Sequence, residues 1–408
     1  MDDETIGTLT LSKRESVLEE VASIYTHEKY GLLEISSLPS ISKILKRKIF
    51  QPEKKVIVLI VGGHSTGKSS FVNWFFGDNI QKVSAAIETS KITFITTGRK
   101  RQTLDGNTTI KVFDFLEAYK DIPNFVENLQ TEKRLPVKER SSLVTFIDTP
   151  GLIPDKSRLA YDSEQILLNL SRHANLIFVF NDPIGQAFSE PLLDFVEKSH
   201  IECRNKIHFF LSKSDSIDSN ERNRIVASIA QTLTNKVSKV TIDVRPFHLP
   251  QKDLKKMKSN EDGIGDDDDL EDSNETSNSL DYICEIIEKA VDNTVQSNLS
   301  QLSNDLNAIT RATEVAIIVM RKRKKFFIFS SVLTGIAIGY FFTAFNSRRI
   351  KFSSQLYLVL IVAVTVWIVS FALKPSATEM KKIEDFRDKV SKKTKIRLEQ
   401  FYREIKND

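Results

Sequence analysis

The sequence predicts an α/β domain with a mostly parallel sheet, followed by helices and a hairpin of two apolar segments. Three observations support this expectation. Four apolar runs each end at a polar motif, as strands buried on both faces of a parallel sheet do. Helical stretches separate these runs, as crossovers between parallel strands require. Near the end of the chain, two uncharged segments approach the ~20 residues that a helix needs to cross a membrane.

The four apolar runs are the expected core strands of the sheet. They are VIVLIV from Val56, LVTFI from Leu143, NLIFVF from Asn175 and IHFFL from Ile207. Ligands bind at the carboxyl ends of strands in such sheets, so the polar motifs that follow the strands should lie at one edge. Between residues 98 and 142 the pattern is irregular. There we expect a hairpin turn at Asp105-Gly106 and a helix over residues 116–129.

Composition divides the 408 residues into six expected parts. An acidic, polar stretch after residue 250 is typical of a flexible linker, and the apolar spacing beyond it is that of amphipathic helices. The parts are an N-terminal helical segment (1–52), the α/β domain (53–250), the acidic linker (251–279), a stalk helix (280–325), a transmembrane hairpin (326–373, with spans 326–345 and 356–373) and an amphipathic tail (374–408). We expect the stalk helix and the tail to pack on each other or on the N-terminal helices.

The segment GGHSTGKSS after the first apolar run has the pattern of a phosphate-binding loop, G-x-x-x-x-G-K-[ST], between a strand and a helix. Its glycines allow successive backbone N–H groups to surround an anion at the start of the helix. We expect Lys68 to reach the β- and γ-phosphates of a nucleotide and Ser69 to ligate Mg²⁺. The expected nucleotide-binding residues of the loop are Gly62, Gly63, His64, Ser65, Thr66, Gly67, Lys68, Ser69 and Ser70.

The motif DTPG at residues 148–151 follows a second strand. Asp148 can hold Mg²⁺ through water, and Gly151 allows a backbone N–H to approach the γ-phosphate. We therefore expect both residues to bind nucleotide and the segment to respond to hydrolysis.

The motif SKSD at residues 212–215 follows a third strand and resembles the guanine-reading motif N/T-K-x-D. We expect the stem of Lys213 to stack on the base and Asp215 to accept two hydrogen bonds from its ring nitrogens. Ser212, the third expected nucleotide-binding residue here, stands where the motif has Asn or Thr. This departure leaves the identity of the base open.

Together these segments resemble the G domain of the dynamin superfamily. GGHSTGKSS is similar to its phosphate-binding loop. The longer runs FVNWFFGDNIQKVSAAIETSKITFIT and DTPGLIPDKSRLAYDSEQILLNLSRHANLIFVFNDPIG resemble the EH-domain-containing membrane-remodelling ATPases and the related sarcalumenin. The resemblance covers roughly residues 20–250. Beyond them the apolar hairpin stands in place of an EH domain, as hydrophobic tails do in mitofusins and atlastins.

The resemblance implies roles for further residues. Thr89 matches the switch threonine that meets Mg²⁺ and positions water, with Ser90 and Thr93 as close competitors. Ser65 falls where dynamin-like loops place a side chain near the β–γ bridge. The expected catalytic residues are then Ser65, Lys68 and Thr89, and the expected metal ligands are Ser69, Thr89 and Asp148. Because the EH-domain relatives are ATPases despite a guanine-type motif, we expect Mg²⁺ with GTP as the favoured nucleotide and ATP as the alternative.

The two apolar segments predict how the chain meets a bilayer. Residues 326–345 and 356–373 contain no charged side chain, a length without a polar face that is unusual for buried helices of a soluble protein. Basic residues precede the first segment and follow the second, so both termini should be cytosolic. The first residues are acidic and polar, unlike a secretory signal. We expect an integral protein of an endomembrane, with the endoplasmic reticulum as one candidate.

Charge and cysteine content limit the expected partners. A net charge of +4 is too small to indicate nucleic-acid binding. Cys203 and Cys284 have no metal-ligand spacing and indicate no disulfide framework. The expected partners are a lipid bilayer and a second copy of the chain, bound through the G domain, while the sequence identifies no other protein partner.

Two hypotheses about function follow from the resemblance and the apolar hairpin. In the first, a nucleoside triphosphatase couples hydrolysis to remodelling, tethering or fusion of the membrane that anchors it. In the second, the chain hydrolyses nucleotide slowly and acts as a membrane scaffold or switch that recruits partners. A third hypothesis, calcium buffering by analogy with sarcalumenin, needs the acidic run at residues 261–272 to face a lumen.

Overall fold

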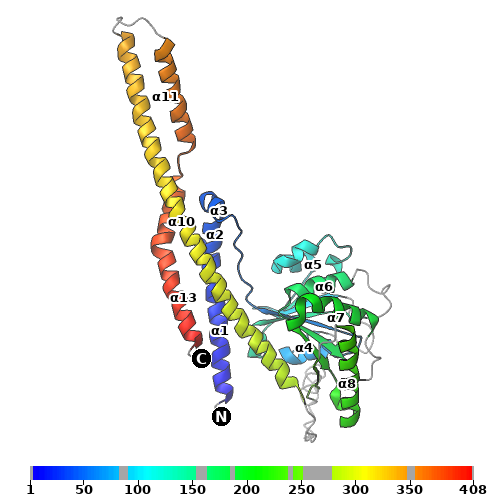
Figure 1. Ribbon diagram of the computed structural model, residues 1–408. Coiled ribbons are helices and arrows are strands. Elements are labelled where there is room, and N and C mark those ends of the chain that lie inside the picture. The colour runs from blue at the N-terminus through cyan, green and yellow to red at the C-terminus, as the bar shows by residue number, and fades with distance from the viewer. Residues whose placement is uncertain are drawn as a thin grey trace. The chain divides into compact units, whose positions relative to one another are not determined.

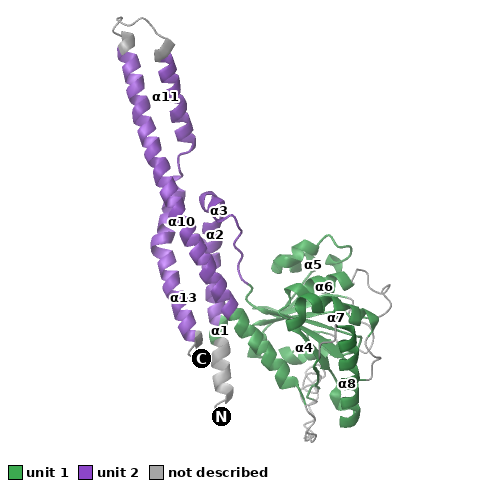
Figure 2. Cartoon of the chain, viewed as in Figure 1, with its two compact units in different colours: residues 1–15, 53–295 green, residues 16–52, 296–408 purple. Residues whose placement is uncertain are grey.

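The computed structural model describes residues 3–81, 91–152, 163–183, 189–237, 242–250, 278–346 and 354–406 (Figure 1). The chain forms two compact units (Figure 2), of which unit 1 comprises residues 1–15 and 53–295 and unit 2 comprises residues 16–52 and 296–408. Two long helices, α1 (Asp3–Thr26) and α10 (Leu280–Asn346), contribute residues to both units. The predicted acidic linker lies outside the described residues, except for residues 278 and 279.

Unit 1 is built on a sheet whose described strands follow the order β3-β4-β2-β5-β1-β6-β7-β8 (Figure 1). Neighbouring strands run parallel except in the pairs β2/β5 and β3/β4. The strands are β1 (Val56–Gly62), β2 (Ile92–Thr97), β3 (Gln102–Leu104), β4 (Leu129–Arg134), β5 (Val144–Asp148), β6 (Leu176–Asn181), β7 (Ile207–Leu211) and β8 (Val244–Pro246). The predicted α/β class with a mostly parallel sheet is therefore confirmed.

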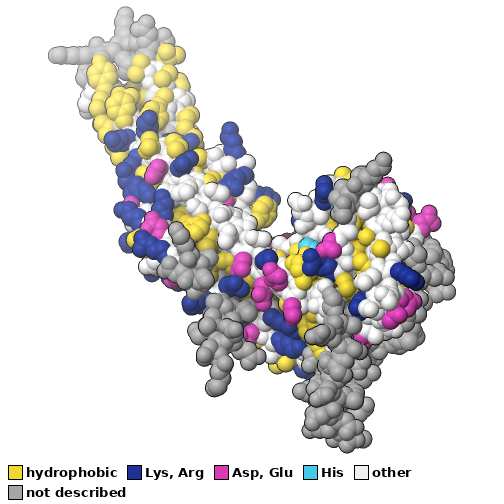
Figure 3. All heavy atoms as spheres, turned by 60° about the horizontal axis from the view of Figure 1, so that its bottom comes forward, with side chains coloured by type: hydrophobic (Ala, Val, Ile, Leu, Met, Phe, Trp, Pro, Cys, Tyr) yellow, Lys and Arg dark blue, Asp and Glu magenta, His cyan; other side chains and the backbone are white. Residues whose placement is uncertain are grey.

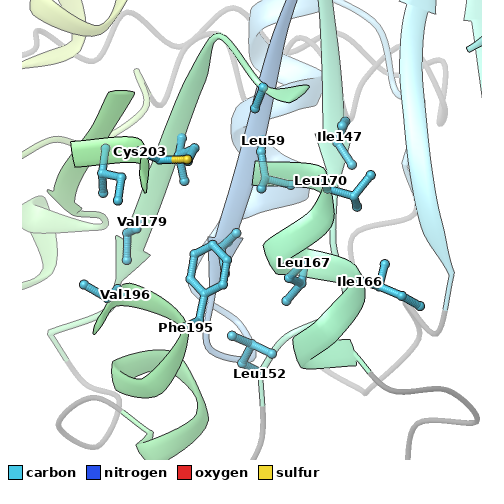
Figure 4. Packing of buried hydrophobic residues seen from close by; sticks show 14 of the residues in the cluster. Leu59, Ile147, Leu152, Ile166, Leu167, Leu170, Val179, Phe195, Val196 and Cys203 are labelled. Atoms are coloured by element: carbon cyan, nitrogen blue, oxygen red, sulfur yellow. The ribbon is translucent and has the colours of Figure 1, made fainter. Parts of the chain in front are cut away.

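Helices cover both faces of this sheet, which explains why its central strands are apolar throughout. They are α4 (Lys68–Phe76), α5 (Gly106–Val112), α6 (Ser163–His173), α7 (Glu190–Cys203) and α8 (Ser219–Lys236). On one face, the ring of Phe71 in α4 makes edge contacts with Phe146 and Phe180. On the other face, Leu59 and Val179 pack in a core that α6 and α7 complete (Figure 4). Successive side chains along each strand point to opposite faces, so they pack into two separate cores, one on each face of the sheet.

Two local predictions in residues 98–142 are wrong. Asp105 forms no hairpin turn, because its side chain accepts a 2.8 Å hydrogen bond from the N–H of Thr108 and caps the start of α5. Residues 116–129 do not form one helix. They include the last residues of the 3₁₀ helix η1 (Asp114–Tyr119), the whole 3₁₀ helix η2 (Val126–Asn128) and the first residue of β4. An aspartate side chain that accepts hydrogen bonds from nearby N–H groups occurs both in turns and at helix N-termini. The Asp-Gly pair alone therefore does not distinguish a hairpin turn from a helix cap.

Unit 2 is a bundle of helices. Besides parts of α1 and α10, it contains α2 (Leu32–Ser37), α3 (Pro39–Leu45), α11 (Ser354–Ala372), α12 (Ala377–Asp385), the π-helical turn η7 (Phe386–Val390) and α13 (Ser391–Lys406). Arg397 of α13 pairs with Glu20 of α1 at 2.8 Å. The side chains of Ile41, Ile317 and Ile383 meet in an apolar core shared by α3, α10 and α12. The stalk helix and the tail therefore pack on each other and on N-terminal helices.

The apolar side chains of α10 are buried in its first part and exposed in its last part. Its first part buries the positions that the three-and-four spacing selects: Leu280, Ile283, Ile287, Val291, Val295, Leu299, Leu302, Leu306 and Ile309 are each at most 8% exposed. Beyond Lys325, apolar side chains such as Phe329 and Ile336 are instead exposed. Figure 3 shows hydrophobic side chains covering the outer part of the α10 and α11 pair, with Lys and Arg beside them.

One described helix is long and apolar enough to cross a membrane, and it spans Leu280–Thr343. Residues 357–372 meet the same test only when joined to residues 377–404 across a bend of 45°. Within the apolar region, α11 lies beside α10 (Figure 1), and the hydroxyls of Ser330 and Ser370 are 2.6 Å apart. The second span of the predicted hairpin stays a prediction.

Candidate nucleotide-binding site

The segment between β1 and α4 folds as a tight loop. Gly67, immediately before α4, has a φ of +79°, and Ser65 has a φ of +57°. This left-handed region suits glycine but is uncommon for serine, so the surrounding loop must hold Ser65 there. The hydroxyl of Thr66 donates a 3.0 Å hydrogen bond to the carbonyl of Gly63. A loop of this kind at the start of a helix presents backbone N–H groups to an anion.

Lys68 lies inside this loop. Its Nζ donates hydrogen bonds to the carbonyl oxygens of Gly63 at 2.7 Å and Gly62 at 3.4 Å. Burial lowers the pKa of Lys68 to about 8, and the nearby charge of Asp148 opposes that shift. The phosphates of a nucleotide would favour the protonated form in the same way. The lysine is therefore positioned and charged for an anionic ligand.

The hydroxyl of Ser69 and the carboxylate of Asp148 lie next to each other. The hydroxyl of Ser69 donates a 2.7 Å hydrogen bond to Oδ2 of Asp148, which is fully buried at the end of β5. The other carboxylate oxygen, Oδ1, is buried without a hydrogen-bond partner among the described residues. Burial raises the pKa of Asp148, while Lys68 and the Ser69 hydrogen bond act against the rise. A buried carboxylate with a free oxygen beside a hydroxyl fits Mg²⁺, which prefers such oxygen ligands.

The DTPG segment packs directly on the loop. The N–H of Leu152 donates a 3.0 Å hydrogen bond to the carbonyl of Gly62, and the hydroxyl of Thr149 donates one of 2.8 Å to Ile60. A Cβ atom on Gly151 would lie 2.8 Å from the backbone of His64. Only glycine allows this approach, so the DTPG segment lies directly against the phosphate-binding loop.

The SKSD segment meets the same loop from another strand. The hydroxyl of Ser212 donates toward the carbonyl oxygens of Thr66 at 2.8 Å and Asn181 at 2.9 Å. Lys213 follows with a φ of +51°. Asp215 is exposed in the 3₁₀ turn at Ser214–Ser216. The serine that departs from the guanine-reading motif therefore still ties this turn to the phosphate-binding loop.

Asn181 and Asp182, at and after the end of β6, belong to the site although they were not among the predicted residues. Asp182 pairs with Lys213 at 2.6 Å, and its side chain is 8% exposed. The side-chain nitrogen of Asn181 is buried without a hydrogen-bond partner among the described residues. Their position directly after an apolar run was the signal that could have found them.

The other predicted residues are distributed as follows. Gly62 ends β1, His64 and Ser65 are exposed in the loop, and Ser70 lies in the first turn of α4. Thr89 and its competitor Ser90 lie outside the described residues. The competitor Thr93 lies within β2, opposite Asp148, and its hydroxyl accepts a 3.1 Å hydrogen bond from Gln130. The loop, DTPG and SKSD residues thus meet at one edge of the sheet.

A strand, an anion-binding loop with a buried lysine, and a carboxylate beside the first turn of the next helix define a P-loop nucleotide hydrolase. Residues 58–225 match the dynamin family. This part of the chain is therefore similar to the nucleotide hydrolase domain of the dynamin family.

Two relatives match this chain by sequence over little more than half of its length. EH domain-containing protein 2 of Rattus norvegicus is 25% identical over 243 residues, and EH domain-containing protein 1 of Arabidopsis thaliana is 22% identical over 250 residues. These matches cover 56% and 57% of this chain but 41% and 44% of the relatives, so the chain spans about two fifths of their length. A solved structure of an oligomerised bacterial dynamin pair matches with 12% identity and a TM-score of 0.46, covering 93% of this chain and 63% of that one.

Proposed function

We propose that the chain is a membrane-anchored, dynamin-like nucleoside triphosphatase that couples hydrolysis to membrane remodelling, tethering or fusion. GTP is the favoured substrate and ATP is the alternative. The observation that carries the proposal is that one chain combines the Lys68 and Asp148 site with a helix whose apolar side chains are exposed. Soluble proteins rarely leave a large, continuous apolar surface in water, so such a surface marks a membrane or protein contact.

The phosphate-binding loop does the electrostatic work of the proposed reaction. Lys68 and the backbone N–H groups of residues 62–70 bind the β- and γ-phosphates and stabilise charge that develops on them. Ser65, held in the left-handed region, directs its hydroxyl toward the β–γ bridge. The N–H of Gly151 bonds the γ-phosphate, so the DTPG segment is released when that phosphate leaves.

Ser69, Thr89 and Asp148 are the proposed ligands of Mg²⁺. The ion supplies charge neutralisation at the phosphate oxygens. Asp148 holds the hydroxyl of Ser69 in place through their hydrogen bond, and its buried Oδ1 remains available. Thr89 orients the attacking water in this proposal, as a switch threonine does in the family that the sequence resembles.

The SKSD turn is the proposed base-reading element. Asp215 is exposed and has no partner among the described residues, so its two carboxylate oxygens can accept from a guanine ring. When a nucleotide binds, Lys213 gives up its ion pair with Asp182, and its aliphatic stem then stacks on the base. Ser212 holds the turn against the loop at Thr66. Guanine is favoured because adenine offers no matching pair of donors to a carboxylate.

The apolar parts of α10 and α11 form the proposed transmembrane hairpin. Thr334 donates a 3.1 Å hydrogen bond to the carbonyl of Ala363, and Ser330 bonds Ser370. Contacts of this kind between helices satisfy polar groups that lipid cannot. The exposed basic residues 321–325 precede the first span, which favours cytosolic termini and keeps the nucleotide site on the cytosolic side. An endomembrane such as the endoplasmic reticulum is the proposed location.

The proposal is tested by measuring GTP and ATP turnover by the full-length chain, in detergent and in liposomes of rising protein density. We expect one nucleotide to be preferred and its turnover to rise with density, because crowding on a surface brings G domains together. The variant Lys68→Ala should abolish turnover in both settings. Binding with negligible, density-independent turnover would instead support the membrane scaffold or switch.

A further inference from the structure

A cavity of about 220 Å³ lies in unit 1 at the amino ends of β7 and β8. It is lined by α7, the two strands and the first turns of α10, through residues that include His200, His208, Arg245 and Tyr282. The phosphate-binding loop follows β1 at the carboxyl edge of the same sheet, and none of its residues lines the cavity. This cavity is therefore separate from the site described above. Its volume is that of roughly seven water molecules.

Two guanidinium groups give the cavity a positive character. Arg245 stacks on the ring of Tyr282, with its Cζ atom 3.8 Å from the ring centroid, and pairs with Asp243 at 2.7 Å. Asp243 is 70% exposed, so water screens this pair, and the charged side chains that line the cavity are two guanidinium groups and one carboxylate. Arg204, which is exposed in the 3₁₀ turn Arg204–Lys206 directly after α7, makes no ion pair among the described residues. A ligand in the cavity thus meets one fixed guanidinium and one free guanidinium.

Two imidazoles add hydrogen-bonding capacity. His208 lies within ring-contact distance of Tyr282, at 6.4 Å between centroids. Both ring nitrogens of His200 are buried and have no hydrogen-bond partner among the described residues. Burial, together with Arg204 beside His200 and Arg245 beside His208, lowers the pKa of each imidazole. An anion would offset the guanidinium charge and so favour protonation of both rings.

We propose that this cavity binds a phosphate monoester. Guanidinium groups match the oxygens of phosphate, and Arg204 and Arg245 approach the cavity from different elements. The imidazoles, the amide of Asn205 and the hydroxyl of Tyr282 provide further donors around the same space. Asp243 carries the only carboxylate among the lining residues, and its side chain is exposed to water.

Occupancy of the cavity has a mechanical consequence within unit 1. Tyr282 belongs to the first turn of α10, whereas His208 belongs to β7 and Arg204 belongs to the 3₁₀ turn between α7 and β7. A phosphate bonded to both sides would fasten the start of α10 to the β7 and β8 edge. The site would thus respond to a ligand other than the hydrolysed nucleotide, and the inference does not depend on the proposed hydrolysis.

The test is calorimetric titration of the full-length chain in detergent with inorganic phosphate and with glycerol 3-phosphate. Saturating GDP and Mg²⁺ are present so that the phosphate-binding loop is occupied. We expect saturable binding that weakens about tenfold in Arg204→Gln, the usual scale for one charge-assisted hydrogen bond. The matched control is Arg172→Gln, because Arg172 is exposed, pairs with Glu202 and lies outside the cavity.

The pH dependence gives a second readout. Between about pH 7.5 and pH 6, protonation of His200 and His208 beside Arg204, Arg245, Asp243 and Tyr282 should increase phosphate affinity over the value expected from the ligand alone, which loses negative charge in the same range. The variant His208→Phe, which keeps the ring, should reduce that increase while turnover of nucleotide stays unchanged. Dihexanoyl phosphatidic acid is titrated in parallel: tighter binding than glycerol 3-phosphate identifies a lipid headgroup as the source, and equal binding identifies a soluble phosphate.

Two results would overturn the inference. One is equal phosphate affinity in the unsubstituted chain, Arg204→Gln and His208→Phe. The other is no phosphate binding once GDP and Mg²⁺ fill the loop.

Discussion

The hydroxyl of Ser69 donates a 2.7 Å hydrogen bond to the carboxylate of Asp148, a residue 79 positions further along the chain. This contact joins the first turn of α4 to the end of β5. It also leaves the second oxygen of Asp148 buried and without a partner among the described residues. A buried, unpartnered carboxylate oxygen is costly, and a cation is the partner that fits it best.

The first prediction concerns Asp148→Asn. The amide keeps the size of the side chain but removes the charge that would hold Mg²⁺. Because metal ions contribute several kcal/mol to the stabilisation of phosphoryl-transfer transition states, turnover should fall by about 10²-fold or more. Turnover measured against Mg²⁺ concentration checks this expectation. Nucleotide binding in EDTA serves as the control and should change little, since Lys68 and the loop remain. Unaltered turnover with an unaltered Mg²⁺ requirement would contradict the proposed role.

The second prediction identifies the base through Asp215→Asn. A carboxylate that accepts two guanine donors contributes charged hydrogen bonds of about 1.5–3 kcal/mol each, so GTP affinity should fall by about 10²-fold. Xanthosine triphosphate should recover much of the loss, because its base carries an acceptor where guanine carries an amino donor. Competition against a fluorescent nucleotide measures both effects.

The control for this base test is ATP, whose affinity should be the same in the Asp215→Asn variant and the unsubstituted chain. If the substitution instead weakens ATP and leaves GTP unchanged, the guanine assignment fails. In that case Asp215 reads a different base edge.

The third prediction is a pH dependence of stability centred on Lys55. Its Nζ donates to the hydroxyl and carbonyl of Thr97 at 2.6 and 2.8 Å and to the hydroxyl of Thr96 at 3.1 Å. Burial lowers the pKa of Lys55 from 10.5 to about 8 in the folded chain. Between these two pH values the unfolded chain holds a proton that the folded chain has lost. The contribution of Lys55 to the free energy of unfolding therefore rises as pH increases through this window.

Denaturant unfolding of Lys55→Met and the unsubstituted chain, measured from about pH 7 to pH 10, tests this sign. The difference in stability between the two chains should shift in favour of the unsubstituted chain as pH rises. Lys100→Met is the matched control, because Lys100 is exposed and its replacement should leave the pH profile unchanged. A constant difference would show that Lys55 stays charged over this range, and a shift the opposite way would show that folding raises its pKa.

The central strands and the phosphate-binding loop were predictable because their signals are local and strong. A strand buried on both faces must be apolar at nearly every position, as β1 and β6 are. The loop pattern is contiguous, so no long-range contact is needed to recognise it. By contrast, Asp105 and residues 116–129 form short elements in which neighbouring packing decides between turn, cap and 3₁₀ helix.

The contacts that complete the site could not be predicted from the sequence, for a different reason. Asp182 and Lys213 are 31 positions apart, and their pairing depends on the adjacency of β6 and β7. Ser212 looked like a departure from the guanine-reading motif, yet its hydroxyl reaches the carbonyl of Thr66. Hydroxyl and amide side chains can serve the same carbonyl acceptor, and only the geometry shows which residue does so.

The last prediction compares a buried contact in unit 2 with a less buried one. Tyr25 is fully buried and donates a 2.9 Å hydrogen bond to Oδ2 of Asp305, which is 3% exposed. Arg47 donates to the other oxygen of Asp305 at 2.7 Å. Desolvation and the nearby carboxylate raise the pKa of Tyr25, so its hydroxyl stays protonated and remains a donor. The less buried counterpart is the pairing of Glu20 with Arg397, whose side chains are 38% and 34% exposed.

Tyr25→Phe retains the ring but leaves Oδ2 of Asp305 buried without a donor, so the free energy of unfolding should fall by about 1–3 kcal/mol. Glu20→Gln removes an ion pair that water screens and should cost less than about 1 kcal/mol. Denaturant unfolding in detergent, followed by the helical circular-dichroism signal, measures both. Asp305→Asn in the Tyr25→Phe chain should recover part of the loss, because a neutral amide is less costly to bury than an unsatisfied carboxylate. Equal costs for the two single substitutions would mean that Asp305 finds another donor when Tyr25 is gone.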